Sequence, residues 1–163
     1  IKNNIGYDIR KKKVLILGAG GAAMGIIPNI LYEQPLEFKI YNRTYEKAKK
    51  LCNKFLDIGK LEIVSLEDLK KNKFDIIINS TSAGISDTEF FLPNNFFEND
   101  AICYDLSYGA ASNSFKNWAN KNKLTFYDGL GMLLEQAADS FYIWELKRPV
   151  ITDELKNILL EKL

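Results

Sequence analysis

Short apolar runs alternate with longer stretches of mixed character along most of this chain. The apolar runs are rich in Ile, Leu and Val, and several end in glycine or in small polar residues. Such continuous runs are typical of strands that are buried on both faces of a parallel sheet. The pattern predicts strands at Val14–Leu17, Phe38–Tyr41, Leu61–Val64, Asp75–Asn79, Ala101–Leu106 and Leu124–Tyr127.

Most of the stretches between these runs have helical spacing. Thr44 and Ser65 each precede such a stretch and are expected to cap it, and Pro28 should bend the first helix. Residues 80–100 hold Gly, Pro and paired Asn and are expected to be mostly loop. Helices are predicted from about Gly20 to Tyr32, from Thr44 to about Phe55, after Ser65, from Ser112 or Asn113 to Asn120, over Leu130–Leu146 and up to Leu163.

Strand and helix therefore alternate with short connections. This order predicts an α/β fold: a Rossmann-like, doubly wound parallel sheet of about six strands with helices on both faces. On the last long helix, Met132, Leu133, Phe141, Tyr142 and Trp144 follow helical spacing and are expected to lie mostly in the core. We expect residues 1–163 to form one domain.

Charge and composition exclude several classes of function. The net charge is +1, which gives no sign of a surface for nucleic acid. No apolar run approaches the roughly 20 residues that span a bilayer. Cys52 and Cys103 have no metal-type spacing and are expected to be buried free thiols in a reducing, cytoplasmic compartment, with no metal site. The chain has no histidine, so an acid–base step would need Lys, Asp, Tyr or a group outside this chain.

The turn after the first predicted strand carries the clearest chemical signal. Gly18 to Ala23 read Gly-Ala-Gly-Gly-Ala-Ala, a G-x-G-x-x-A turn between a strand and a helix. Glycines let backbone N–H groups approach a phosphate, and the helix that follows presents its positive end. Ala22 and Ala23 are small enough for that helix to pack closely on the strand. The turn predicts a dinucleotide pyrophosphate site; a tight turn with no ligand is the alternative.

The end of the second predicted strand indicates which dinucleotide. An NAD-binding domain usually has Asp or Glu there, to accept a hydrogen bond from the ribose 2′-OH. This chain has Asn42 and Arg43, followed by Thr44 and, one helical turn on, Lys47. These groups suit a 2′-phosphate and therefore favour NADP(H). A surface ion pair between Arg43 and Glu46 is the alternative explanation.

Three further segments, read with these residues, resemble the NADP-binding domain of shikimate dehydrogenases. The most specific is Gly129-Leu130-Gly131-Met132-Leu133-Leu134-Glu135-Gln136, which holds the family's Gly-x-x-Met-Leu-x-x-Gln spacing. The others run from Asn79 to Gly84 and from Tyr104 to Tyr108. The resemblance covers nearly the whole chain from about Lys13 onward. One departure is Asn113-Ser114, where the family often has Thr-Pro, so the start of that helix can differ.

The resemblance implies a role for each position. It implies that the pyrophosphate is held by Gly18, Ala19, Gly20, Gly21 and Ala22, and the 2′-phosphate by Asn42, Arg43, Thr44 and Lys47. It places along the rest of the cofactor Thr81, Ser82 and Ala83, and at the nicotinamide Leu106, Gly129 and Met132. It also implies that Tyr108 and Gln136 face the cleft and contact the small-molecule substrate, shikimate or 3-dehydroshikimate.

In this family the catalytic Lys–Asp pair lies on an N-terminal substrate domain, to which nothing in this chain corresponds. We therefore expect no catalytic residue here; Asp105 is more suited to orienting backbone in its loop. The chain is expected to bind NADP(H) without turnover, as half of an enzyme that reduces 3-dehydroshikimate with NADPH in aromatic amino acid biosynthesis. The alternatives are a quinate/shikimate dehydrogenase of broader specificity and a stand-alone nucleotide-sensing module. Glutamyl-tRNA reductases share the turn and an Asn-Arg-Thr segment but not the Gly129–Gln136 pattern. The sequence gives no oligomeric state.

Overall fold

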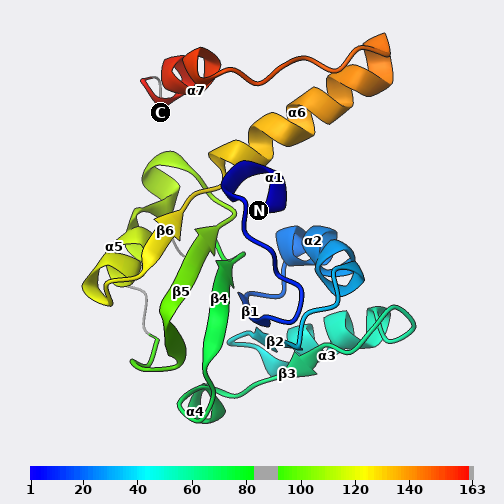
Figure 1. The fold of residues 1–163 in the computed structure, drawn as a ribbon. Coiled ribbons are helices and arrows are strands. Elements are labelled where there is room, and N and C mark those ends of the chain that lie inside the picture. Colours follow the sequence, from blue (N-terminus) through cyan, green and yellow to red (C-terminus); the bar gives the residue numbers. More distant parts are fainter. Residues whose placement is uncertain (83–91, 162–163) are drawn as a thin grey trace.

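The computed structural model describes residues 1–82 and 92–161. Six parallel strands form one sheet in the order β3-β2-β1-β4-β5-β6 (Figure 1). The strands are β1 Lys13–Leu17, β2 Glu37–Tyr41, β3 Glu62–Ile63, β4 Phe74–Asn79, β5 Phe97–Asp105 and β6 Thr125–Tyr127. The helices are α1 Lys2–Ile5, α2 Gly21–Tyr32, α3 Tyr45–Lys54, α4 Leu66–Leu69, η2 Gly109–Ser112, α5 Asn113–Lys121, α6 Leu130–Glu145 and α7 Asp153–Leu160. The predicted fold class is confirmed.

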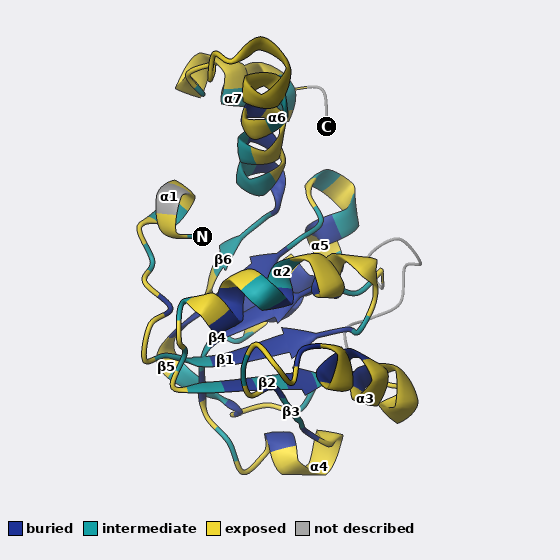
Figure 2. Cartoon of the chain, turned by 90° about the vertical axis from the view of Figure 1, so that its right-hand side faces the viewer, coloured by how far each residue is buried: buried dark blue, intermediate teal, exposed yellow. Residues whose placement is uncertain are grey.

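Two hydrophobic clusters sandwich the sheet, one on each face. Alternate residues of β1 point to opposite faces: Val14 and Ile16 join one cluster, and Leu15 and Leu17 join the other. The first cluster includes residues of α2 and α3, and the second includes residues of α4 and α5. Figure 2 shows the strands buried between these helices. Helices thus cover both faces, as a doubly wound sheet requires.

Two element predictions need correction. β5 begins at Phe97 rather than at Ala101, because Phe97 pairs with Phe74 and the register then shifts. The polar residues 98–100 interrupt the apolar pattern, so the sequence did not show this early start. Thr44 occupies the N-cap position of α3, but its side chain makes no capping hydrogen bond. By contrast, the Ser65 side chain accepts a hydrogen bond from the Asp68 amide, as predicted.

The largest error concerns α6. Of the five residues expected to be core, Trp144 is 76% exposed and Tyr142 is 50% exposed, with Phe141 and Leu133 also exposed and Met132 only half-buried. The reason is visible in Figures 1 and 2: α6 begins beyond the end of β6 and runs away from the sheet, so the sheet does not cover its apolar side. Its buried residues are Leu130, Leu134 and Ala138.

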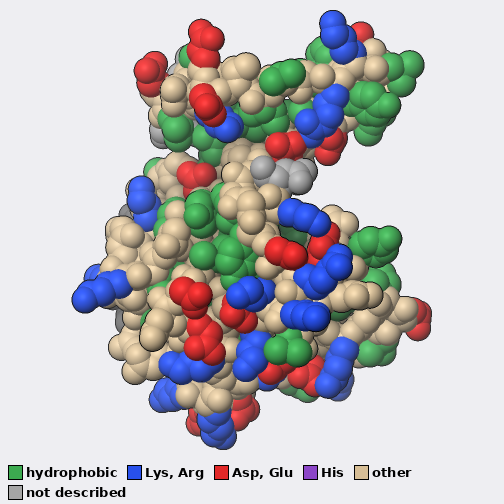
Figure 3. Space-filling view, in the orientation of Figure 1, with side chains coloured by type: hydrophobic (Ala, Val, Ile, Leu, Met, Phe, Trp, Pro, Cys, Tyr) green, Lys and Arg blue, Asp and Glu red, His purple; other side chains and the backbone are tan. Residues whose placement is uncertain are grey.

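The outer half of α6 and the segment that returns along it carry apolar side chains at the surface, seen as green atoms at the top of Figure 3. Arg148 fastens the returning segment by pairing with Glu135 and Asp139 on α6. Within the described residues, no helix is both long and apolar enough to cross a membrane.

Candidate functional site

The carboxyl ends of the central strands meet at one edge of the sheet. β1 ends at Leu17, β2 at Tyr41, β4 at Asn79 and β5 at Asp105, and all four strands are parallel neighbours. The loops that follow these strands carry nearly all of the sequence-predicted site residues. In a sheet of this kind, ligands bind beyond this edge where the strand order reverses, here between β1 and β4.

Gly18 begins the turn after β1 and has no room for a side chain. Its φ is +100°, a conformation that favours glycine, and its amide donates to the Tyr41 carbonyl at 2.8 Å. A Cβ on Gly18 would lie 2.9 Å from Ser80 Oγ and 3.0 Å from Thr81 Cγ2. Ser80 Oγ in turn donates to the Leu17 carbonyl at 2.7 Å. The turn after β1 is thus locked to the loop after β4.

The next two glycines leave the start of α2 open. Gly20 is the N-cap, Gly21 is the first helical residue, and a Cβ on either would meet nothing within 4 Å. The first-turn amides of a helix have no partners within the helix, so this end is suited to an anion. Ala23 is buried against the sheet as predicted, but Ala22 is exposed, because it faces the open edge rather than the strands.

The segment after β2 lies against the same turn. Asn42 Oδ1 accepts from the Ala19 amide at 3.1 Å, and Asn42 Nδ2 donates to the Thr44 carbonyl at 2.8 Å. Arg43, Thr44 and Lys47 are exposed. The Arg43–Glu46 ion pair that we considered does not form, and neither Arg43 nor Lys47 pairs with any described residue. Two cationic side chains therefore stand beside the glycine turn with no counter-charge among the described residues.

The ends of β4 and β5 are joined by a buried polar pair. Asn79 Nδ2 donates to Asp105 Oδ2 at 2.9 Å, and the two residues are 1% and 0% exposed. Burial raises the pKa of the Asp105 carboxyl to about 6, although hydrogen bonds from Asn79 and Ser107 oppose the rise. Asp105 accepts from the Ser107 amide and so holds the backbone of its loop, as expected. Because the side chain is buried and both its oxygens accept hydrogen bonds, it cannot contact a substrate.

This pKa shift predicts a pH-dependent stability. A carboxyl whose pKa is 3.8 when unfolded and about 6 when folded favours the folded state most below pH 4 and loses that contribution as the pH rises through 6. The loss is on the order of 3 kcal/mol, at about 1.4 kcal/mol per pKa unit. The measurement is the free energy of unfolding in urea of wild type and of Asp105→Asn at pH 4, 5, 6 and 7. The difference between the two proteins isolates the contribution of Asp105, because the other carboxyls titrate in both. Parallel curves would contradict the assignment.

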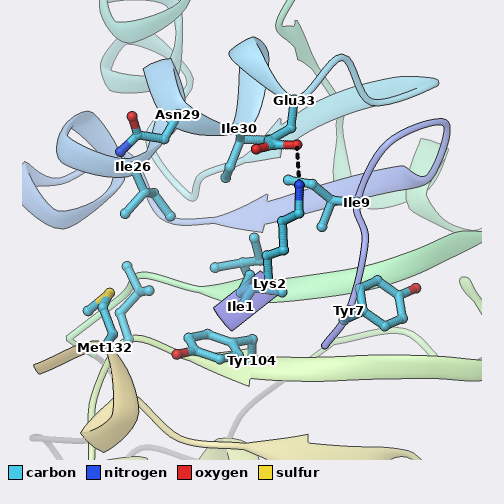
Figure 4. Close-up of a pocket in the computed structure, with 12 residues that line it drawn as sticks. Ile1, Lys2, Tyr7, Ile9, Ile26, Asn29, Ile30, Glu33, Tyr104 and Met132 are labelled. Atoms are coloured by element: carbon cyan, nitrogen blue, oxygen red, sulfur yellow. Dashed lines mark ion pairs between the residues drawn. The ribbon is translucent and has the colours of Figure 1, made fainter. Parts of the chain in front are cut away.

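A pocket of about 220 Å³ lies beside this edge, on the α2 face of the sheet (Figure 4). Its apolar wall includes Ile26 and Ile30 of α2, together with Tyr104, Leu106 and Met132. The structure thus brings together Leu106 and Met132, both predicted nicotinamide contacts. Its polar side holds the Lys2–Glu33 ion pair, 4.0 Å between Nζ and Oε2.

Gly129 closes the space between the β5 loop and α6. Its amide donates to the Ser107 carbonyl at 2.8 Å, and a Cβ there would lie only 2.2 Å from the Leu106 carbonyl oxygen. Tyr108 precedes η2 and is 37% exposed, and Gln136 is exposed on α6. Within the described part of the chain neither side chain makes a hydrogen bond. The structure therefore shows no contact that would place Tyr108 and Gln136 in a common site.

Of the predicted residues after β4, Thr81 is half-buried and Ser82 exposed, whereas Ala83 lies outside the described residues. Two residues at this edge were given no individual role by the sequence: Ser80, which fastens the glycine turn, and Asn79, which holds Asp105. Their sequence signals are that they follow the apolar run Ile76–Ile78 and that they lie in the Asn79–Gly84 segment.

The strand order, the glycine turn and the open helix end define a dinucleotide-binding domain of the Rossmann type. The family model described as shikimate / quinate 5-dehydrogenase matches residues 1–89. The chain belongs to this family.

Known relatives agree with this assignment. The chain is 42% identical over 154 residues to the shikimate dehydrogenase (NADP(+)) of Cellvibrio japonicus, covering 94% of this chain and 56% of that protein. The crystal structure of an Ael1 enzyme from Pseudomonas putida has a TM-score of 0.83 at 35% identity, covering 99% of this chain and 58% of that one. A shikimate 5-dehydrogenase from Listeria monocytogenes, in complex with shikimate and NAD, has a TM-score of 0.83 at 30% identity, covering 97% and 59%. The chain therefore spans somewhat more than half the length of the proteins it matches.

Proposed function

We propose that this chain is the NADP(H)-binding part of a shikimate dehydrogenase. The observation that carries the proposal is the pair of exposed cations, Arg43 and Lys47, which pair with none of the described residues and lie beside a glycine turn that opens a helix N-terminus. An acid at position 42 or 43 would repel a 2′-phosphate, and this chain has Asn42 and Arg43 instead. The Cellvibrio relative is named for NADP(+), which supports the same choice.

The residues present fit the parts of this cofactor. The turn from Gly18 to Ala22 would hold the pyrophosphate on backbone amides, and Arg43 would hold the 2′-phosphate with its planar donor fork, helped by Asn42, Thr44 and Lys47. Asn42 keeps one amide hydrogen for this, since only one of its two is used within the loop. Bound NADPH would supply a hydride.

At the other end, Leu106 and Met132 would provide an apolar surface for the nicotinamide, and the Gly129 backbone would meet its carboxamide. Thr81, Ser82 and Ala83 would lie along the cofactor between the two ends. Tyr108 and Gln136 would border the cleft for shikimate or 3-dehydroshikimate. These contacts orient the two reactants and exclude water from the site.

The proton for the ketone oxygen would come from outside this chain. The sequence has no histidine, and Asp105 is buried with both oxygens occupied. We propose that residues 1–163 act as one cofactor domain and that the proton donor lies in the part of the relatives that this chain does not match. The buried free thiols of Cys52 and Cys103 suit a reducing compartment such as the cytoplasm.

Titration of the purified chain with NADPH and NADH tests the proposal. NADPH should bind at least about tenfold more tightly than NADH, because only NADPH carries the 2′-phosphate that Arg43 and Lys47 would meet. Incubation with NADPH and 3-dehydroshikimate should give no turnover. Equal affinity for the two cofactors would refute the NADP assignment, and turnover at the rate of a complete enzyme would refute the placement of the proton donor.

A further inference from the structure

The buried pair Asn79–Asp105 lies at the centre of the carboxyl edge. The two residues are register partners at the last paired positions of β4 and β5. Polar residues in a fully apolar part of a sheet stabilise the fold less well than packed hydrophobic residues of the same volume would. Their presence here calls for a role other than filling the core.

Each member of the pair holds the loop that follows its own strand. Asn79 Oδ1 accepts from the Thr81 amide at 3.1 Å and from Thr81 Oγ1 at 2.7 Å. Asp105 Oδ1 accepts from the Ser107 amide at 2.8 Å. The Nδ2–Oδ2 hydrogen bond between the two side chains therefore sets the position of one loop relative to the other.

The same network reaches the start of α6. The Ser107 carbonyl accepts from the Gly129 amide at 2.8 Å, and the Leu106 amide donates to the Asn79 carbonyl at 2.9 Å. The pair thus holds the segments of Thr81 and Leu106 directly, and Gly129 is attached to the second of these through the Ser107 carbonyl. All three are the segments that the proposed function places beside the nicotinamide half of the cofactor. The adenosine half would contact a different set of residues, around Asn42 and Arg43.

We propose that Asn79 and Asp105 are positioning residues that align the loops contacting the nicotinamide half of NADP(H), independently of the adenosine half. This inference rests on the proposed function. It assigns the pair a role in cofactor geometry that neither residue performs by contact, since both are buried.

The hydrogen-bonding pattern of the pair can be inverted. Asn79→Asp alone sets two carboxyls against each other, and Asp105→Asn alone sets two amide groups against each other. In the double variant N79D/D105N, the carboxylate at position 79 accepts from Thr81 and from the amide at position 105. That amide still offers an oxygen to Ser107. Every hydrogen bond of the network is then restored, and only the one between the two side chains has donor and acceptor exchanged.

The test compares the affinities of NADPH and of adenosine 2′,5′-bisphosphate, which lacks the nicotinamide half. Each single variant should weaken NADPH about tenfold, a loss typical of one misplaced set of contacts, and leave the bisphosphate within about twofold. The double variant should regain NADPH affinity to within about threefold of wild type. If single variants lose both ligands equally, or neither, or if the double variant is no better than the singles, the inference is wrong.

A second variant keeps the test decisive if the single variants do not fold. N79L/D105L replaces the pair with apolar residues of similar shape and leaves no buried charge, so it should fold. It should still weaken NADPH about tenfold while binding the bisphosphate normally. Normal NADPH binding by this folded variant would show that the pair has no positioning role. Failure of wild type to bind either ligand would instead refute the proposed function.

Discussion

Replacing Gly129 with alanine is expected to lower the free energy of unfolding by about 3 kcal/mol, at the upper end of what overpacking costs. The added Cβ would lie 2.2 Å from the Leu106 carbonyl oxygen, 2.6 Å from the Leu106 carbonyl carbon and 3.2 Å from the Asp105 carbonyl oxygen. All three atoms belong to the backbone and cannot rotate away. The backbone at Gly129, with φ of −81°, is allowed for alanine, so the loss would come from the clash alone.

Gly25→Ala is the matched control. Gly25 lies within α2, and a Cβ there would meet nothing within 4 Å. Alanine at this position should raise stability by roughly 0.5–1 kcal/mol, because glycine is a poor helix former. Urea unfolding followed by circular dichroism measures both variants. A loss below about 1 kcal/mol for Gly129→Ala would show that the Leu106 loop moves aside freely, since relief of strain limits the cost of overpacking.

The same clash has a consequence for the proposed site. Leu106 and Gly129 approach each other so closely that the loop after β5 and the first turn of α6 leave no room for a side chain between them. Glycine at position 129 is therefore needed for packing whether or not its backbone meets a carboxamide. This explains how a motif that signals function can have a purely steric requirement at one of its positions.

Local patterns in the sequence predict the centre of this fold well. β1 and β4 are short apolar runs, and a run with no polar face has few stable places other than the middle of a parallel sheet. The glycine turn is equally local, because strand, turn and helix follow one another within Val14–Tyr32. These elements needed no knowledge of the rest of the chain.

Features that depend on distant residues were missed. Helical periodicity shows that α6 has an apolar side, but it does not show whether the sheet extends far enough to cover Phe141 and Trp144. Similarly, Asn79 and Asp105 are 26 residues apart, and their contact can be seen only once β4 and β5 are known to be neighbours. The sequence therefore predicted the site residues that belong to a motif, but it did not predict the contact between the two buried residues that support them.

Replacing Arg43 with aspartate is expected to weaken NADPH binding about 100-fold while changing NADH binding by less than about threefold. The substitution removes a charge-assisted donor fork and puts a carboxylate where the 2′-phosphate would lie, so attraction becomes repulsion. Arg43 is exposed and pairs with none of the described residues, so the variant should fold normally. Fluorescence titration of both cofactors measures the two affinities.

Arg10→Asp provides the control because it makes the same change of charge on an exposed arginine. Arg10 precedes β1 and therefore lies at the opposite edge of the sheet from Arg43, which follows β2. A general electrostatic effect on a polyanionic cofactor would appear in both variants, and added salt would suppress it. A contact with the 2′-phosphate would appear in Arg43→Asp alone and with NADPH alone. Equal losses for NADPH and NADH in that variant would remove Arg43 from the site and leave Lys47 as the remaining candidate for discriminating between the cofactors.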